Sequence, residues 1–159
     1  MISFLRVCAA LSFAALVMSA QVVDLSGTWQ LDVQKSRWGK HPKPTAATVI
    51  IEHHEPKFKY QGTSEFENGT ETSDGKKSFA FDGAIDGKTY PISGSNGPST
   101  MTIRRTNPTT TVSEMKSAGG VTVETAKTTI SGDGKQLTRE FKASGPNGVT
   151  SWTEVYIRR

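Results

Sequence analysis

Apolar and polar residues alternate along short stretches of this chain from residue 28 to its end. The clearest stretch covers residues 57–66, where Phe58, Tyr60 and Phe66 share one face while lysine, glutamine and threonine occupy the other. A period of two residues is typical of a β-strand with one buried face. The same reasoning predicts ten strands, at residues 28–34, 46–54, 57–66, 77–81, 88–93, 100–106, 109–117, 121–131, 135–143 and 149–158.

Turn signals separate these strands. Seven Asn-Gly or Asp-Gly dipeptides favour tight hairpin turns, because Gly accepts a positive φ freely and Asn or Asp accept it better than other residues. Short turns make consecutive strands neighbours, and one twisted sheet of this many strands closes and loses its edges. We therefore predict an all-β fold, an up-and-down antiparallel β-barrel of about 8–10 strands, with a two-sheet β-sandwich as the alternative. The dipeptides are Asn68-Gly69, Asp74-Gly75, Asp82-Gly83, Asp86-Gly87, Asn96-Gly97, Asp133-Gly134 and Asn147-Gly148.

The segment 1–20 differs from the rest of the chain. Arg6 precedes an apolar run at residues 7–17, and small residues close the segment, which is the order expected of an export signal. We predict cleavage after Ala20, which leaves one barrel domain at residues 21–159 without a stable membrane anchor. A segment that stays uncleaved in the membrane is the alternative. Cys8 lies in the signal, so the exported domain contains no cysteine, and its predicted location is the periplasm or the extracellular space.

The charge of the chain and the motifs it contains argue against several classes of function. Loss of Arg6 with the signal changes the formal charge from +4 to +3, and the lysines are spread along the chain. Nucleic-acid binding needs clustered basic residues beside stacking aromatics, so we expect no nucleic-acid partner. His53 and His54 are adjacent in a strand and point to opposite faces, and no dinucleotide, phosphate-loop or nucleophile-elbow motif is present. We therefore predict no metal, no cofactor and no catalytic residue.

Strand parity places several aromatic and charged side chains on inward faces. A fully packed interior does not tolerate several charges, whereas a cavity with converging polar groups does. We therefore predict that a small apolar or amphipathic molecule binds inside the barrel. An ion pair between Arg139 and Glu154 on neighbouring strands is the purely structural interpretation. The candidate cavity residues are Phe58, Tyr60, Phe66, Phe79, Phe81, Tyr90, Arg105, Arg139, Trp152, Glu154 and Tyr156.

Residues 35–45 interrupt the strand pattern with one glycine and two prolines. The segment carries four basic residues around Trp38. One interpretation is a lid or portal that attracts anionic ligands. The other is a solvated loop whose Trp38 plugs the base of the barrel.

The chain resembles the calycin group, which contains the lipocalin and fatty-acid-binding barrels. Gly27-Thr28-Trp29 matches the Gly-x-Trp of the first strand in that group, and residues 153–158 look like the closing strand of a fatty-acid-binding protein. The mature chain is also similar to small exported bacterial proteins described as lipocalin-like. The resemblance implies that Trp29 closes one end of the barrel and packs against a basic side chain from near the last strand, Arg158 (or Arg159). It also implies the binding of a small, largely apolar ligand.

Two features depart from the fatty-acid carriers of that group. Those carriers insert a helical pair after the first strand, whereas residues 35–45 contain two prolines, which oppose a helix. The carriers also hold the ligand carboxylate with an Arg two residues before the closing-strand Tyr. That position is Glu154 here, before Tyr156, and an acidic group repels a carboxylate. We therefore do not expect a fatty-acid clamp of that type.

Three functions stay open at this point. The first is an exported barrel that binds a small, largely apolar ligand in its internal cavity. The second is a filled barrel that acts through its surface, as an inhibitor or an envelope interaction protein. The third is a small-molecule enzyme on the same barrel, with Glu154, Tyr156 and Arg139 for acid–base chemistry. We expect a protein that is not an enzyme, and the sequence leaves the ligand and the oligomeric state open.

Overall fold

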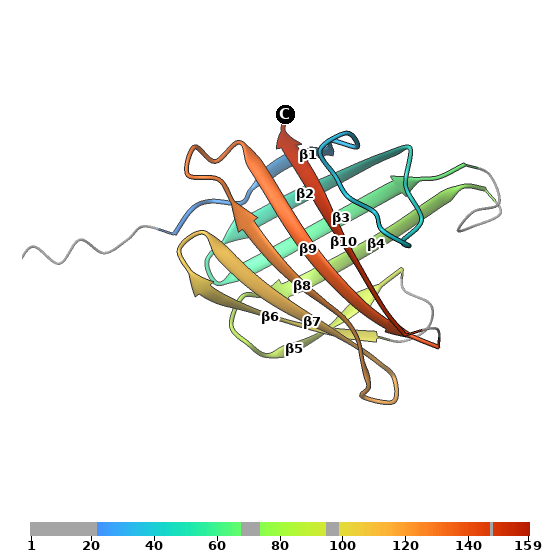
Figure 1. Ribbon diagram of the computed structural model, residues 1–159. Helices are drawn as coiled ribbons and strands as arrows, with labels where there is room; N and C mark the ends of the chain where they lie inside the picture. The colour runs from blue at the N-terminus through green and yellow to red at the C-terminus, as the bar shows by residue number, and fades with distance from the viewer. Residues whose placement is uncertain (1–21, 68–73, 95–98, 147) are drawn as a thin grey trace, which may run out of the picture.

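Ten strands form one closed antiparallel barrel, in the order β1-β10-β9-β8-β7-β6-β5-β4-β3-β2 (Figure 1). The structure is a computed structural model that describes residues 22–67, 74–94, 99–146 and 148–159. Every sequential pair of strands is hydrogen-bonded, so the predicted all-β up-and-down barrel is confirmed and the sandwich alternative is wrong. The strands are β1 (Gly27–Leu31), β2 (Ala46–His54), β3 (Lys57–Glu65), β4 (Lys76–Ala84), β5 (Thr89–Ser93), β6 (Ser99–Asn107), β7 (Thr110–Ser117), β8 (Thr122–Ile130), β9 (Gln136–Gly145) and β10 (Gly148–Arg158).

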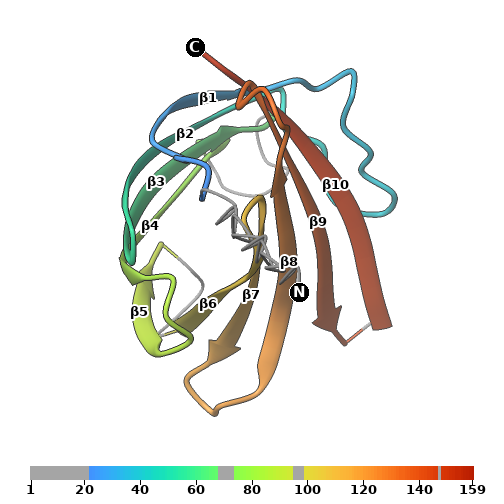
Figure 2. The ribbon, with the colours of Figure 1, turned by 90° about the vertical axis from the view of Figure 1, so that its left-hand side faces the viewer.

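Figure 2, a view along the barrel, shows the strands following one another around the interior. In β2 and β3 exposed and buried residues alternate almost without exception, with Val49, Ile51, Phe58 and Tyr60 turned inward. Burial of these apolar faces is the main favourable contribution to the stability of such a sheet. In the described residues, no helix is long and apolar enough to cross a membrane. The predicted export signal at residues 1–20 and the predicted turns at Asn68-Gly69, Asn96-Gly97 and Asn147 lie outside the described residues.

One predicted turn is wrong. Asp82-Gly83 lies inside β4, which continues to Ala84, and Gly83 does not have a positive φ. The glycine is used for close packing instead, because a Cβ atom there would lie 2.6 Å from Cγ of Tyr90. In contrast, Gly87 and Gly134 do adopt a positive φ in turns.

Strand β1 is shorter than predicted and ends at Leu31. The side chain of Asp32 accepts hydrogen bonds from the backbone amides of Gln34 and Lys35, which forms a tight turn. The Ser36 hydroxyl donates to the carbonyl oxygen of Asp32 at 2.7 Å and so secures the same turn. The chain therefore leaves the strand direction three residues earlier than the alternating pattern indicates.

Trp29 closes one end of the barrel, which we call the closed end. Its side chain is fully buried, and its indole nitrogen donates to the Leu25 carbonyl oxygen at 2.9 Å. The Arg158 guanidinium lies over the indole ring, 4.5 Å from its centroid, and Arg158 also donates to the Asp24 carbonyl oxygen. The segment before β1 crosses this end and reaches the β6–β7 turn, where the Val23 amide donates to the Pro108 carbonyl oxygen.

The opposite, open end has a wall built partly from the loop of residues 32–45. Because β1 is short, β10 extends beyond it, and the loop pairs with that free edge through the bridge between Arg37 and Thr153. The backbone amide of Val155 also donates to the Ser36 hydroxyl at 2.9 Å. Figure 1 shows this blue-to-teal loop beside β10. No helix occurs in residues 32–45, in agreement with the prediction from the prolines.

Candidate functional site

The open half of the barrel encloses a cavity of about 360 Å³. The closed half is packed more tightly and contains a void of about 40 Å³. Four side chains line both spaces and so form the floor of the cavity, namely Tyr60, Met101, Arg139 and Tyr156. The cavity is lined further by Trp38, His41, Pro44, Ser64, Phe66, Lys77, Phe79, Ile92, Gly94, Ser99, Met115, Ser117, Val123, Glu124, Phe141, Trp152 and Glu154.

A polar network on β9 and β10 crosses the cavity floor. Arg139 and Glu154 are directly opposite each other in the strand register, and Nη1 of Arg139 lies 3.8 Å from Oε2 of Glu154. Glu154 also accepts hydrogen bonds from the Trp152 indole at 3.1 Å and from the Tyr156 hydroxyl at 3.0 Å. Both carboxylate oxygens of Glu154 therefore have partners within the protein. The predicted ion pair is present, inside the cavity rather than in a packed core.

Burial controls the protonation of this network. Burial raises the pKa of Tyr60 to about 12 and, together with the charge of Glu154, raises the pKa of Tyr156 still further. Burial opposes the charge of Arg139, but Glu154 and the tyrosines outweigh it and raise the Arg139 pKa. The two phenols consequently keep their protons near neutral pH and the guanidinium keeps its charge. This arrangement suits hydrogen bonding better than proton abstraction.

Parallel aromatic rings line the cavity near its opening. The Phe141 and Trp152 rings stack with centroids 4.7 Å apart, and His41 stacks on Trp152 at 3.8 Å, each pair within 4° of parallel. Trp38 continues the series, 6.4 Å from His41. Arg139 lies over Phe141, 4.6 Å from the ring centroid. The loop of residues 32–45 thus contributes two rings, Trp38 and His41, to the cavity wall.

Glu124 adds a second acid to the cavity. Burial raises its pKa, and the charge of Glu154 raises it too, whereas Arg139 and, least, Lys77 lower it. Glu124 forms no hydrogen bond or ion pair with any residue in the described part of the chain. Lys77 also lines the cavity and is engaged in an interaction of its own.

Most of the predicted cavity residues lie where strand parity puts them, on the inside of the barrel. Seven of them line the cavity: Tyr60, Phe66, Phe79, Arg139, Trp152, Glu154 and Tyr156. Three lie outside it. Phe58 lines only the small void of the closed half, and Phe81 is buried core against Phe58 and Tyr90. The Tyr90 hydroxyl donates to Asp86 at 2.9 Å, away from the cavity.

Arg105, the last predicted cavity residue, lies at the closed end. Its guanidinium donates to Oε2 of Glu55 at 2.8 Å and to the Pro108 carbonyl oxygen, while the buried His53 ring contacts the same Glu55 oxygen at 2.6 Å. Burial raises the Glu55 pKa, but the hydrogen bonds from Arg105 and His53 outweigh it and lower the pKa overall. His53 also accepts a hydrogen bond from the Leu25 amide. This cluster fastens the segment before β1, and its position makes Arg105 a structural residue.

Sequence reasoning missed several lining residues. Phe141 shares the face of Arg139 and could have been found from parity alone. Met115 and Glu124 lie on β7 and β8, where threonines obscure the alternation and the register shifts between Met115 and Lys116. His41 lies in a loop whose position depends on the distant pairing of Arg37 with Thr153, which no local pattern reports.

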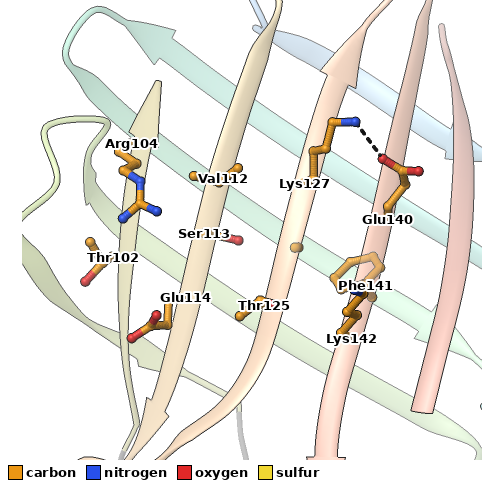
Figure 3. Close-up of a pocket in the computed structure, with 11 residues that line it drawn as sticks. Thr102, Arg104, Val112, Ser113, Glu114, Thr125, Lys127, Glu140, Phe141 and Lys142 are labelled. Atoms are coloured by element: carbon orange, nitrogen blue, oxygen red, sulfur yellow. Dashed lines mark ion pairs between the residues drawn. The ribbon is translucent and has the colours of Figure 1, made fainter. Parts of the chain in front are cut away.

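A second hollow, of about 420 Å³, lies on the outer face of β6 to β9 (Figure 3). Its exposed side chains carry mixed charges, and Lys127 and Glu140 form an ion pair of 3.1 Å across it. The rim also includes Arg104, Glu114 and Lys142. This surface lacks the aromatic wall of the interior cavity, so the interior is the better candidate for a small-molecule site.

Comparisons with known proteins show the fold. No protein-family model and no curated protein matches the sequence. Among solved structures, the chain is similar to zebrafish ileal bile acid-binding protein complexed with cholic acid, with a TM-score of 0.57 and 12% identity over 85% of this chain and 98% of that one. It is also similar to Rv2717c from M. tuberculosis, with a TM-score of 0.52 and 17% identity over 85% and 92% of the two chains. These likenesses agree with the closed antiparallel β-barrel of the structure.

Proposed function

We propose that this protein is an exported barrel that binds a small, largely apolar or amphipathic molecule in its cavity. The observation that carries the proposal is the 360 Å³ space itself, enclosed by aromatic and methionine side chains over a floor of converging polar groups. Binding sites for small molecules have this composition and begin at about 300 Å³. A similar barrel, the zebrafish protein, is complexed with cholic acid, which supports the proposal by analogy.

The alternatives are weaker on the same observations. A filled barrel that acts through its surface does not require the cavity. An enzyme would use Glu154 or Tyr156 as an acid or base, but Glu154 already accepts two hydrogen bonds and burial holds the proton on Tyr156. Export, to the periplasm or beyond the cell, is proposed from the sequence of residues 1–20 alone.

Native mass spectrometry of the exported protein tests the proposal. We expect extra mass under native conditions that disappears on denaturation, either directly or after incubation with a mixed lipid extract. Met115→Trp fills the cavity from β7 and should abolish the extra mass. Val112→Trp places the same ring on the outer face of that strand and should leave it unchanged. An apo mass in every sample would contradict cavity binding and favour the filled-barrel function.

A further inference from the structure

The charged groups of the cavity differ in how many hydrogen bonds and ion pairs they form within the protein. Glu154 has hydrogen bonds on both oxygens and an ion pair with Arg139, and Lys77 has an interaction of its own. Glu124 lines the same cavity from β8 without a hydrogen bond or ion pair to any described residue. Glu124 is half-buried, and a carboxylate partly removed from water without such partners costs free energy, which a bound molecule can recover.

The neighbours of Glu124 determine which kind of group can pair with it. Arg139 on β9 and Lys77 on β4 are the facing cations, Glu154 on β10 is the facing anion, and Tyr60 on β3 keeps its proton. The guanidinium is committed to Glu154 and to the faces of Phe141 and Tyr60. An incoming carboxylate would therefore meet two acids and only engaged cations. An ammonium or another N–H donor would meet an acid with a free acceptor.

The rest of the cavity suits the other end of such a molecule. Ile92, Met101 and Met115 supply apolar and polarisable surface in the same cavity as the Phe141–Trp152–His41 stack. Aromatic faces also attract a cation, and so they do not oppose an amine that passes them on its way to Glu124.

We propose that the cavity binds an amphipathic amine, with its N–H group on the Glu124 carboxylate and its apolar body against the ring stack. This inference rests on the proposed function, because it names the class of ligand for the same cavity. It also states that the site discriminates against the corresponding carboxylic acid. Charge-assisted hydrogen bonds of this kind are about twice as strong as neutral ones.

Three probes with alkyl chains of the same length and different polar ends test the inference: decylamine, decanol and decanoate. Trp38 and Trp152 line the cavity, so intrinsic fluorescence reports binding, and calorimetry gives the affinities independently. Near neutral pH we expect decylamine to bind at least about tenfold more tightly than decanoate, a difference of about 1.4 kcal/mol. Glu124→Gln should weaken decylamine about tenfold and leave decanol unchanged. Glu140→Gln, an exposed acid on the outer face of β9, is the matched control and should change neither.

The outcomes separate the two proposals. If decanoate binds as tightly as decylamine, or if Glu124→Gln leaves decylamine binding intact, the amine inference is wrong while cavity binding stands. If none of the probes binds and the native mass is that of the apo protein, both proposals fail. The comparison of probes on the unmodified protein keeps the inference falsifiable even if Glu124→Gln folds poorly.

Discussion

Arg139 and Glu154 face each other across β9 and β10 at the floor of the cavity, with 3.8 Å between guanidinium nitrogen and carboxylate oxygen. Glu154 also accepts hydrogen bonds from the Trp152 indole and the Tyr156 hydroxyl. The acid and its partner on the neighbouring strand neutralise each other. The Arg139 guanidinium is therefore paired with an acid of the protein and is not a free positive charge for a ligand carboxylate.

Removal of Arg139 should lower the stability of the protein, because Glu154 then has no counter-ion. Arg139→Met leaves Glu154 without its counter-ion in a largely buried site. We expect the free energy of unfolding to fall by about 3 kcal/mol. This loss is at the low end of the range for buried ion pairs because the cavity admits some solvent. Urea unfolding followed by tryptophan fluorescence measures this loss. The double variant Arg139→Met with Glu154→Gln should recover at least about 1 kcal/mol. Simple additivity of the two single losses would show that the residues are not coupled.

The barrel itself could be predicted from the sequence because its signals are local. In β2 and β3 a large apolar residue marks nearly every inward position, as Val49, Ile51, Phe58 and Tyr60 show, so parity identifies the buried face. The burial of Trp29 against Arg158 could likewise be expected from a short motif and a resemblance. The ends of strands are harder to predict from the alternation. Hydrogen bonds to the side chain of Asp32 end β1 earlier than the pattern indicates.

The candidate site was only partly predictable because its depth depends on the whole barrel. Parity shows that Phe58 and Arg105 point inward, but not how deep in the barrel they lie. Phe58 lines the small void below the cavity floor, and Arg105 lies at the closed end. Glu124 carried no signal, since threonines surround it on β8 and a register shift in β7 changes the pairing. Trp38 reaches the cavity through a pairing of residues more than a hundred positions apart in the chain, Arg37 with Thr153.

Gly62 leaves room for the end of the Phe79 ring beside β3. A Cβ atom at Gly62 would be 2.3 Å from Cζ of Phe79, so Gly62→Ala should push that ring into the cavity. We expect a stability loss of about 1–3 kcal/mol and weaker binding of any cavity probe. Thermal unfolding and a decanol titration measure the two effects. Gly132→Ala, at a turn where a Cβ meets nothing within 4 Å, is the control and should leave binding unchanged.

Ser36 should hold the loop of residues 32–45 on the barrel. Its hydroxyl accepts from the Val155 amide at 2.9 Å, so Ser36→Ala leaves a buried N–H without a partner at a cost of about 1–2 kcal/mol. Because the loop carries Trp38 and His41, we expect red-shifted tryptophan emission and stronger acrylamide quenching. Ser151→Ala, at an exposed position of β10, is the control. An unchanged emission maximum would mean that other contacts hold the loop in place.

Glu124→Gln should stabilise the protein in a manner that depends on pH. Burial raises the Glu124 pKa above its ordinary value of 4.5, so the folded protein binds this proton more tightly than the unfolded chain does. Stability is therefore lost as the pH rises from the unfolded value through the folded one, and the acid is a liability near neutral pH. The neutral amide removes that liability, so the variant should unfold at higher urea concentration than the wild type near neutral pH.

The same linkage predicts where the benefit of Glu124→Gln ends. Well below the unfolded value of 4.5, Glu124 is protonated in both folded and unfolded chains, and variant and wild type should converge. Arg139, Lys77 and Glu154 face the site and are present in both proteins, so their own effects cancel in the comparison. Urea midpoints measured across this range give the difference directly, with Glu140→Gln as the exposed control. A difference in urea midpoint that stays constant with pH would instead attribute the change to packing. The charged form of Glu124 would then not be disfavoured in the folded protein, and a bound amine would have no such cost to relieve.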